Sequence, residues 1–181
     1  LKRKYNGPAD IKFINGDFLK FNLPVDGNPQ RIVGNLPYNI STQIILKLID
    51  DYEFIEDMHF LVQREVAEKI TGQKSTKNWG KLAIKIGLFF ESEILFDVPP
   101  EAFDIKPKVT SSFIRLIKKD SLEYDISLKS NFFKIVDLAF TSRRKNIKNN
   151  LQKIGIDWEK INIDPKKRPE EISIEEYINI S

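Results

Sequence analysis

The chain has 181 residues and a formal net charge of only +3, with 29 Lys and Arg against 26 Asp and Glu. The absence of Cys excludes disulfides, thiolate catalysis and cysteine-ligated zinc, and a single histidine, His59, argues against a metal cluster or a Ser-His-Asp triad. No apolar run approaches the ~20 residues that span a bilayer. We therefore expect a folded, cytoplasmic protein, without a membrane segment or a metal.

Strand-like and helical patterns alternate through the first two thirds of the chain. Apolar and β-branched residues predict strands at Ile11–Ile14, Arg31–Gly34, Met58–Val62, Ile94–Val98 and Val109–Ile117. Apolar periodicity predicts a helix that carries Ile44, Ile45, Leu48 and Ile49 after an Asn39 or Ser41 cap, and helices at Arg64–Ile70 and Leu82–Phe90. This alternation indicates an α/β sheet with crossover helices, whose last two strands pair antiparallel because no helix connects them.

The pattern changes after Asp120. Helical periodicity recurs at Phe132–Phe140, Ile147–Ile154 and Ile174–Ile178, and no strand is indicated there. We therefore place a domain boundary near residue 121, with an α/β domain over residues 1–120 and a small all-α domain over residues 121–181.

Four residues, Asn35-Leu36-Pro37-Tyr38, follow a predicted strand at the edge of the sheet where open α/β folds bind ligands. Two acceptors, the Asn35 side chain and a Leu36 carbonyl aimed by the following proline, suit the two N–H bonds of an exocyclic amino group. Tyr38 offers a face for stacking a base. The composition thus suits methylation of adenine, although four such residues can also form a simple strand-ending turn.

Two more residues are candidates for the same site. Asp17 also follows a strand and can accept a hydrogen bond from an adenine-containing cofactor, or can simply cap a helix. Phe103 lies in a loop restrained by Pro99, Pro100 and Pro107, where it can stack on a base or fill the core.

Basic residues are concentrated near the end of the chain. Residues 141–168 carry nine Lys or Arg against three Asp or Glu, a charge of +6. Arg144 and Lys148 are four residues apart, and a helix would place them on one face suited to phosphates. Lys106 and Lys108 lie close to Phe103, and a polar loop at 72–78 adds Lys74 and Lys77. Taken alone, such charge runs are more often a solvated face.

Three segments in this order resemble the rRNA adenine N6-dimethyltransferases, which include the KsgA (RsmA) and Erm enzymes. They are residues 33–42 (VGNLPYNIST), 63–67 (QREVA) and 98–111, from Val98-Pro99-Pro100 to Ser111. Phe140 to Lys145 and the stretch from Ile163 to Ser173 are similar to KsgA signatures that Erm enzymes lack.

The resemblance implies a Rossmann-like class I methyltransferase domain that uses S-adenosyl-L-methionine. Its substrate would be two adjacent adenines near the 3′ end of small-subunit rRNA, in immature 30S particles, with the enzyme acting as a monomer. By position, Asn35, Leu36, Pro37 and Tyr38 match the catalytic motif, and Phe103 the aromatic beside the flipped base. Asp17 and Asn35 match cofactor-binding positions, and Arg143, Arg144, Lys145 and Lys148 an RNA-binding segment.

The front of the family pattern is missing, because neither the glycine-rich cofactor loop nor the acidic residue after the second strand is present. We therefore expect a chain without the first strands of the fold. Two alternatives stay open: a non-catalytic RNA-binding module, and a methyltransferase for DNA adenine or protein glutamine.

Overall fold

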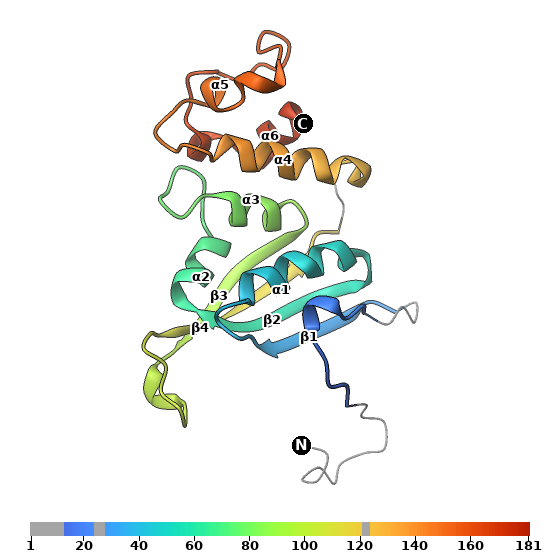
Figure 1. The fold of residues 1–181 in the computed structure, drawn as a ribbon, viewed down its shortest axis with the longest axis vertical. Coiled ribbons are helices and arrows are strands. Elements are labelled where there is room, and N and C mark those ends of the chain that lie inside the picture. The colour runs from blue at the N-terminus through green and yellow to red at the C-terminus, as the bar shows by residue number, and fades with distance from the viewer. Residues whose placement is uncertain (1–12, 24–27, 121–123) are drawn as a thin grey trace.

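A computed structural model describes residues 13–23, 28–120 and 124–181. Four strands form one mixed sheet in the order β1-β2-β4-β3 (Figure 1). The strands are β1 (Gln30–Asn35), β2 (Ile55–Gln63), β3 (Phe90–Val98) and β4 (Ser111–Lys118). The α/β prediction is confirmed.

The two kinds of strand pairing follow from the connections. β1 and β2 run parallel, with Gly34 opposite Phe60, and α1 (Ser41–Leu48) forms the crossover between them. β4 pairs antiparallel with both β2 and β3, so that the predicted antiparallel pairing of the last two strands is confirmed.

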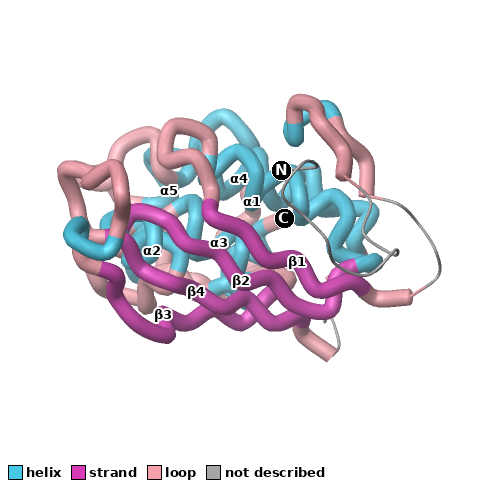
Figure 2. Tube along the Cα trace, turned by 90° about the horizontal axis from the view of Figure 1, so that it is seen from below, coloured by secondary structure: helices cyan, strands magenta, loops and turns pink. Residues whose placement is uncertain are grey.

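Three helices, α1, α2 (Arg64–Ile70) and α3 (Lys81–Gly87), lie on one face of the sheet (Figure 2). Alternation along the strands buries Met58, Phe60 and Val62 of β2 beneath them. Alternate residues, such as Val33 and Phe96, point to the opposite face and are more than half exposed.

The described residues after the sheet contain helices and no strand. They form α4 (Lys129–Ala139), α5 (Ile147–Asn150) and α6 (Ile174–Ile180). Short 3-10 helices add Phe18–Lys20, Ile49–Phe54, Pro100–Ala102, Ile126–Leu128, Gln152–Ile154 and Pro169–Glu171. The boundary proposed near residue 121 coincides with residues 121–123, which lie outside the described part, and stays a prediction.

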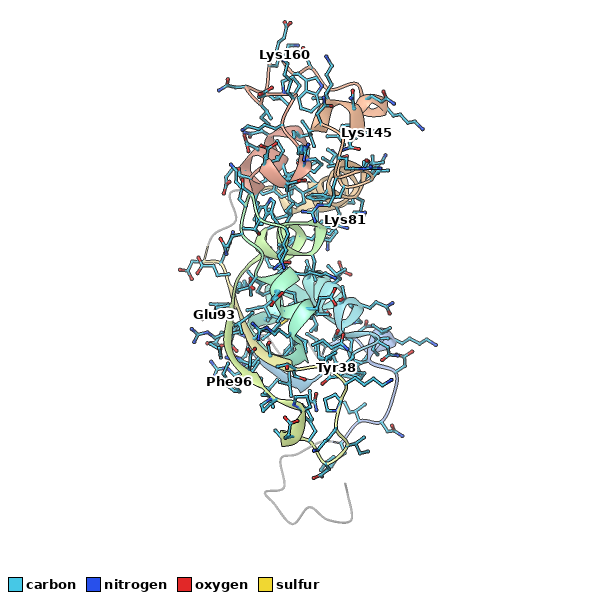
Figure 3. The ribbon with its side chains drawn as sticks, turned by 90° about the vertical axis from the view of Figure 1, so that its left-hand side faces the viewer. Tyr38, Lys81, Glu93, Phe96, Lys145 and Lys160 are labelled. Atoms are coloured by element: carbon cyan, nitrogen blue, oxygen red, sulfur yellow. The ribbon has the colours of Figure 1, made fainter. Side chains whose placement is uncertain are left out.

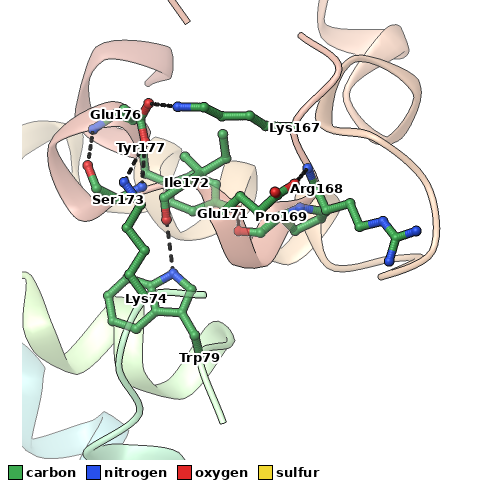
Figure 4. A network of polar contacts seen from close by, with 10 residues as sticks. All are labelled: Lys74, Trp79, Lys167, Arg168, Pro169, Glu171, Ile172, Ser173, Glu176 and Tyr177. Carbon is green, nitrogen blue, oxygen red and sulfur yellow. Dashed lines mark hydrogen bonds and ion pairs between the residues drawn. The ribbon is translucent and has the colours of Figure 1, made fainter. Parts of the chain in front are cut away.

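The helical part shares a core with α3 and is joined to the loop before α3 by a polar network (Figure 4). The Trp79 indole donates to the Ile172 carbonyl at 2.9 Å, and Ser173 and Glu176 cap the start of α6 reciprocally. Lys74 pairs with Glu176 at 3.6 Å, so the 72–78 loop is tied to this network.

Several predicted boundaries are wrong for identifiable reasons. Phe13 and Ile14 form no strand, and Ile11 and Lys12 lie outside the described residues. The expected Leu82–Phe90 helix ends at Gly87, because the rest of that apolar run turns into β3. β4 begins at Ser111, two residues later than expected.

The expected caps and the end of a later helix also differ. Ile40 is the N-cap of α1 and neither Asn39 nor Ser41 caps it; the Ser41 hydroxyl donates to the Tyr38 carbonyl instead. The helix expected over Ile147–Ile154 ends at Asn150, and a 3-10 turn follows it.

Candidate active site

The segment Asn35-Leu36-Pro37-Tyr38 leaves the carboxyl end of β1 with its residues alternately inward and outward. Leu36 is buried and its N–H donates to the Leu61 carbonyl of β2 at 3.1 Å. Asn35 and Pro37 are exposed. The turn closes when Ile40 N–H donates to the Pro37 carbonyl at 3.1 Å. The segment is therefore fixed to the sheet while Asn35 faces solvent.

Two hollows meet at this segment. One, of about 410 Å³, is lined by Asp17, Phe18, Ile32, Ile40, Ile44 and residues 34–37, among others. The other, of about 300 Å³, is lined by Tyr38, Phe103, Ile105, Pro107 and again residues 35–37. Asn35, Leu36 and Pro37 line both, so they form the wall between the hollows.

Asp17 lies at the first hollow, as the sequence predicts, although no strand precedes it among the described residues. Its carboxylate caps the 3-10 helix Phe18–Lys20 by accepting from Leu19 N–H at 3.0 Å. The carboxylate is half exposed, so it keeps acceptor capacity for a further donor. Phe18 and aliphatic side chains provide apolar walls that suit a purine ring.

Phe103 lies at the second hollow, in the loop between β3 and β4. The 3-10 helix Pro100–Ala102 precedes it, and its N–H donates to the Pro100 carbonyl at 3.2 Å. Its ring is partly buried, and Lys106 and Lys108 in the same loop are exposed. The structure thus brings Phe103 and Tyr38, 65 positions apart in the sequence, to one hollow.

The four basic candidates of the helical part divide into two kinds. The Arg143 side chain is exposed too, but its guanidinium is engaged by the protein, donating to the carbonyls of Lys77 at 2.8 Å and Trp79 at 2.9 Å. Arg144, Lys145 and Lys148 are exposed.

The helical face expected for these residues does not form. Arg144 lies in a turn and α5 begins only at Ile147, so Arg144 and Lys148 do not share a helical face. Figure 3 shows Lys145 near the end of the molecule opposite to Tyr38.

Ser111 ends one of the segments on which the family resemblance rests, but the sequence assigned it no role in the site. Ser111 is fully buried at the start of β4, and its hydroxyl lies 2.5 Å from the Tyr38 hydroxyl. Only the fold brings these residues together, because they are 73 positions apart in the sequence.

Within the described ranges, no group of three or more His, Cys, Asp or Glu is arranged to hold a metal ion. Across the same residues, no helix is both long enough and apolar enough to cross a lipid bilayer.

A polar segment and two hollows at the carboxyl end of a strand suit the ligand site of an open α/β sheet, and the solved structures described below share the Rossmann-like methyltransferase fold with this chain. A model of the ribosomal RNA adenine dimethylase family matches residues 1–181. The chain belongs to this family, which confirms the resemblance found in its motifs.

Curated relatives agree with this assignment. The chain is 39% identical to a ribosomal RNA small subunit methyltransferase A of Neisseria gonorrhoeae (strain NCCP11945), over 92% of the chain and 65% of that relative. It is 35% identical to the protein of the same name from Dechloromonas aromatica, over 99% of the chain and 71% of that relative. The chain thus spans roughly two thirds of the length of such relatives.

Solved structures show the same fold at lower identity. A dimethyladenosine transferase from Plasmodium falciparum matches with a TM-score of 0.82 and 19% identity, over 99% of this chain and 73% of that one. The 23S rRNA methyltransferase ErmE matches with a TM-score of 0.69 and 23% identity, over 92% of this chain and 69% of that one.

Proposed function

We propose that the protein containing this chain dimethylates N6 of two adjacent adenines near the 3′ end of small-subunit rRNA, using S-adenosyl-L-methionine. The observation that carries the proposal is the wall formed by Asn35, Leu36 and Pro37 between two hollows. A donor in one hollow and a base in the other would meet across these residues.

The residues of the wall supply the acceptors for the reaction. The adenine amino lone pair is delocalised into the ring, which makes it a poor nucleophile. Hydrogen bonds from its two N–H groups to the Asn35 side-chain oxygen and the Leu36 carbonyl would draw the nitrogen toward a pyramidal geometry. Tyr38 and Phe103, which line the same hollow, would stack on the extruded base, and such stacking contributes ~1–3 kcal/mol per base.

The residues of the first hollow fit the adenine end of the cofactor. Asp17 would accept from its exocyclic amino group, while Phe18 and Ile40 would flank the ring. The cofactor, when bound, supplies a methyl group activated by its sulfonium. The described residues include no glycine-rich loop or acidic partner for its ribose and methionine ends, so we assign only the adenine and transfer ends to this chain.

Exposed basic residues would hold the RNA at both ends of the molecule. Lys106 and Lys108 flank the base hollow and would contact phosphates beside the target. Arg144, Lys145 and Lys148 would contact phosphates of a more distant RNA segment, because Lys145 lies far from Tyr38 (Figure 3). Arg143 retains a share in this surface, although two carbonyls already engage it.

This division also supports the assignment of residues 121–181 as an RNA-binding helical domain. We propose that the protein acts as a monomer on immature 30S particles in the cytoplasm.

The test uses protein expressed from the complete reading frame, with methyl-labelled S-adenosyl-L-methionine and three substrates: immature small subunits, mature large subunits and duplex DNA. We expect N6,N6-dimethyladenine, identified by mass spectrometry, only in the small-subunit RNA. Label in DNA would favour the alternative substrate class. Tight RNA binding without any label would favour the non-catalytic module.

A further inference from the structure

The hydroxyl of Tyr38 forms a hydrogen bond with the hydroxyl of the buried residue Ser111. Its oxygen lies 2.5 Å from the Ser111 hydroxyl oxygen, and Ser111 has no exposed surface. Tyr38 itself is only partly buried and lines the hollow together with Phe103. The ring is therefore held at both ends, by its backbone and by its hydroxyl.

The position of Ser111 is itself firmly set. It begins β4 opposite both Gln63 of β2 and Val98 of β3, so two neighbouring strands fix its backbone. The adjacent Arg64 N–H donates to the Thr110 carbonyl at 3.0 Å.

Ser112, the residue after Ser111, holds the start of the β3–β4 loop that carries Phe103. The Ser112 hydroxyl donates to Asp97 at 2.6 Å, and Arg64 pairs with the same carboxylate at 3.1 Å. Asp97 precedes the Phe103 loop and Ser111 follows it, so both ends of that loop are tied down beside Tyr38.

We propose that Ser111 is a positioning residue, which fixes the Tyr38 ring relative to the Phe103 loop for stacking on the target adenine. The proposal rests on the function proposed above. An aromatic ring free to change rotamer would lose that freedom on each binding event, whereas a ring already held by a hydrogen bond loses little. The buried hydroxyl thereby sets the geometry in which the base lies against the wall of acceptors.

A purely structural role for Ser111 makes a different prediction. If its hydroxyl served only to complete the fold, removing it would lower stability and would act independently of Tyr38. If it acts through Tyr38, its removal has an effect only while the Tyr38 hydroxyl is present.

The experiment is a double-mutant cycle with Ser111→Ala and Tyr38→Phe in protein from the complete reading frame, read as kcat/KM for methylation of immature small subunits. We expect each single variant to lose about 5-fold, as for one hydrogen bond, and the double variant to lose no more than either. Ser111→Thr, which keeps the hydroxyl, should restore most of the activity. The matched control is Ser92→Ala, which removes a hydroxyl bonded to the Ile70 carbonyl in the same sheet, and which should leave kcat/KM unchanged.

A second readout does not depend on activity. Fluorotyrosine labelling gives one fluorine resonance for each tyrosine of the protein, five of which lie in this chain, and Tyr38→Phe identifies the Tyr38 line. We expect Ser111→Ala to shift and broaden that line alone, with the melting temperature close to that of Ser92→Ala.

The outcomes separate the two proposals. If the unsubstituted protein transfers no methyl group, the proposed function fails, and the fluorine line still decides whether Ser111 fixes the ring. An unchanged Tyr38 line, or equal losses from Ser111→Ala with and without the Tyr38 hydroxyl, would overturn the positioning role.

Discussion

At the scale of single residues, Gly72 shows how closely the backbone is packed beside the interface with the helical part. A Cβ on Gly72 would lie 2.3 Å from the Asn78 carbonyl oxygen and 2.9 Å from the Trp79 nitrogen. Both are backbone atoms in the loop that the helical part holds, so they cannot move aside cheaply. The sequence indicates a loop here and gives no hint of this contact.

We therefore expect Gly72→Ala to lower the free energy of unfolding by about 1–3 kcal/mol, the usual cost of overpacking. The matched control is Gly80→Ala, whose Cβ would meet nothing closer than 3.9 Å and whose φ is extended. Chemical denaturation of the two variants measures the difference. Equal stabilities would show that the 72–78 loop relaxes freely.

At the same scale, the Asp57 carboxylate makes the stability of the fold depend on pH. Arg31 donates to both of its carboxylate oxygens, at 2.7 and 2.6 Å, and these hydrogen bonds hold the pKa of Asp57 below its usual range. A carboxyl with a depressed pKa stabilises the fold fully above its unfolded-state pKa, ~3.9. That contribution is lost as the pH falls through the lower folded-state pKa.

Asp57→Asn should accordingly destabilise the protein at pH 7 and lose most of this deficit when the pH falls below the folded-state pKa. Urea denaturation across that pH range checks the convergence, with Asp104→Asn, an exposed site, as the control. A deficit that is constant with pH would mean that the ion pair contributes nothing.

Among the site residues, sequence reasoning located those whose chemistry is local. Asn35 to Tyr38 could be found because the residue types, the proline and the preceding strand all indicate a binding site at the carboxyl end of a strand. The roles of Arg143 and Ser111 could not, because each depends on partners more than 60 positions away.

At the scale of elements, the stretch that leads from α3 into β3 shows why boundaries are hard to predict. Residues 82–90 are apolar on most faces, so periodicity gives no sign that α3 ends at Gly87 and β3 begins at Phe90. The change is set by tertiary contacts, such as the Lys119 N–H that donates to the Phe89 carbonyl at 3.0 Å. The types of most elements were predictable and their ends were not.

The turn over residues 141–146 gives a prediction at this scale. Arg143 and the neighbouring Arg144 are both exposed, but Arg143 donates to two carbonyls of the 72–80 segment and approaches Glu170 at 3.8 Å. Lysine cannot reproduce the planar guanidinium that reaches both carbonyls.

We expect Arg143→Lys to cost about 1–2 kcal/mol of stability, and Arg144→Lys to cost nothing measurable. The melting temperatures of the two variants, measured by thermal unfolding, test whether Arg143 but not Arg144 stabilises the fold. If both variants have the melting temperature of the unsubstituted protein, Arg143 does not hold the helical part to the 72–80 segment.

At the scale of the whole molecule, one continuous core joins the sheet and the C-terminal helices. Buried residues run from Ile45 and Phe60 through Ile84 and Phe89 to Phe132 and Tyr177. The sequence predicted the two kinds of structure correctly, and the shared core between them required the coordinates. Because the helical part is fixed to the sheet, its basic surface lies at a set distance from the base hollow.

This arrangement predicts separable effects on RNA binding and on chemistry. Arg144→Glu should weaken binding to small-subunit RNA and make the salt slope of log Kd shallower by about 1–2, without altering the fold. A filter-binding salt series tests this, with Lys160→Glu, a charge reversal at another exposed site of the helical part, as a comparison. An unchanged slope would remove Arg144 from the RNA surface.

The central claim is that the wall of acceptors between the two hollows performs methyl transfer, and Asn35→Ala tests it most directly. The measurement is the single-turnover rate of methyl incorporation into immature small subunits, alongside their binding to the same protein. We predict that the unsubstituted protein places two methyl groups on each of two adjacent adenines. Asn35→Ala should lower the rate on the order of 100-fold or more, while RNA binding stays within about 2-fold. An Asn35→Ala rate equal to that of the unsubstituted protein would contradict the account.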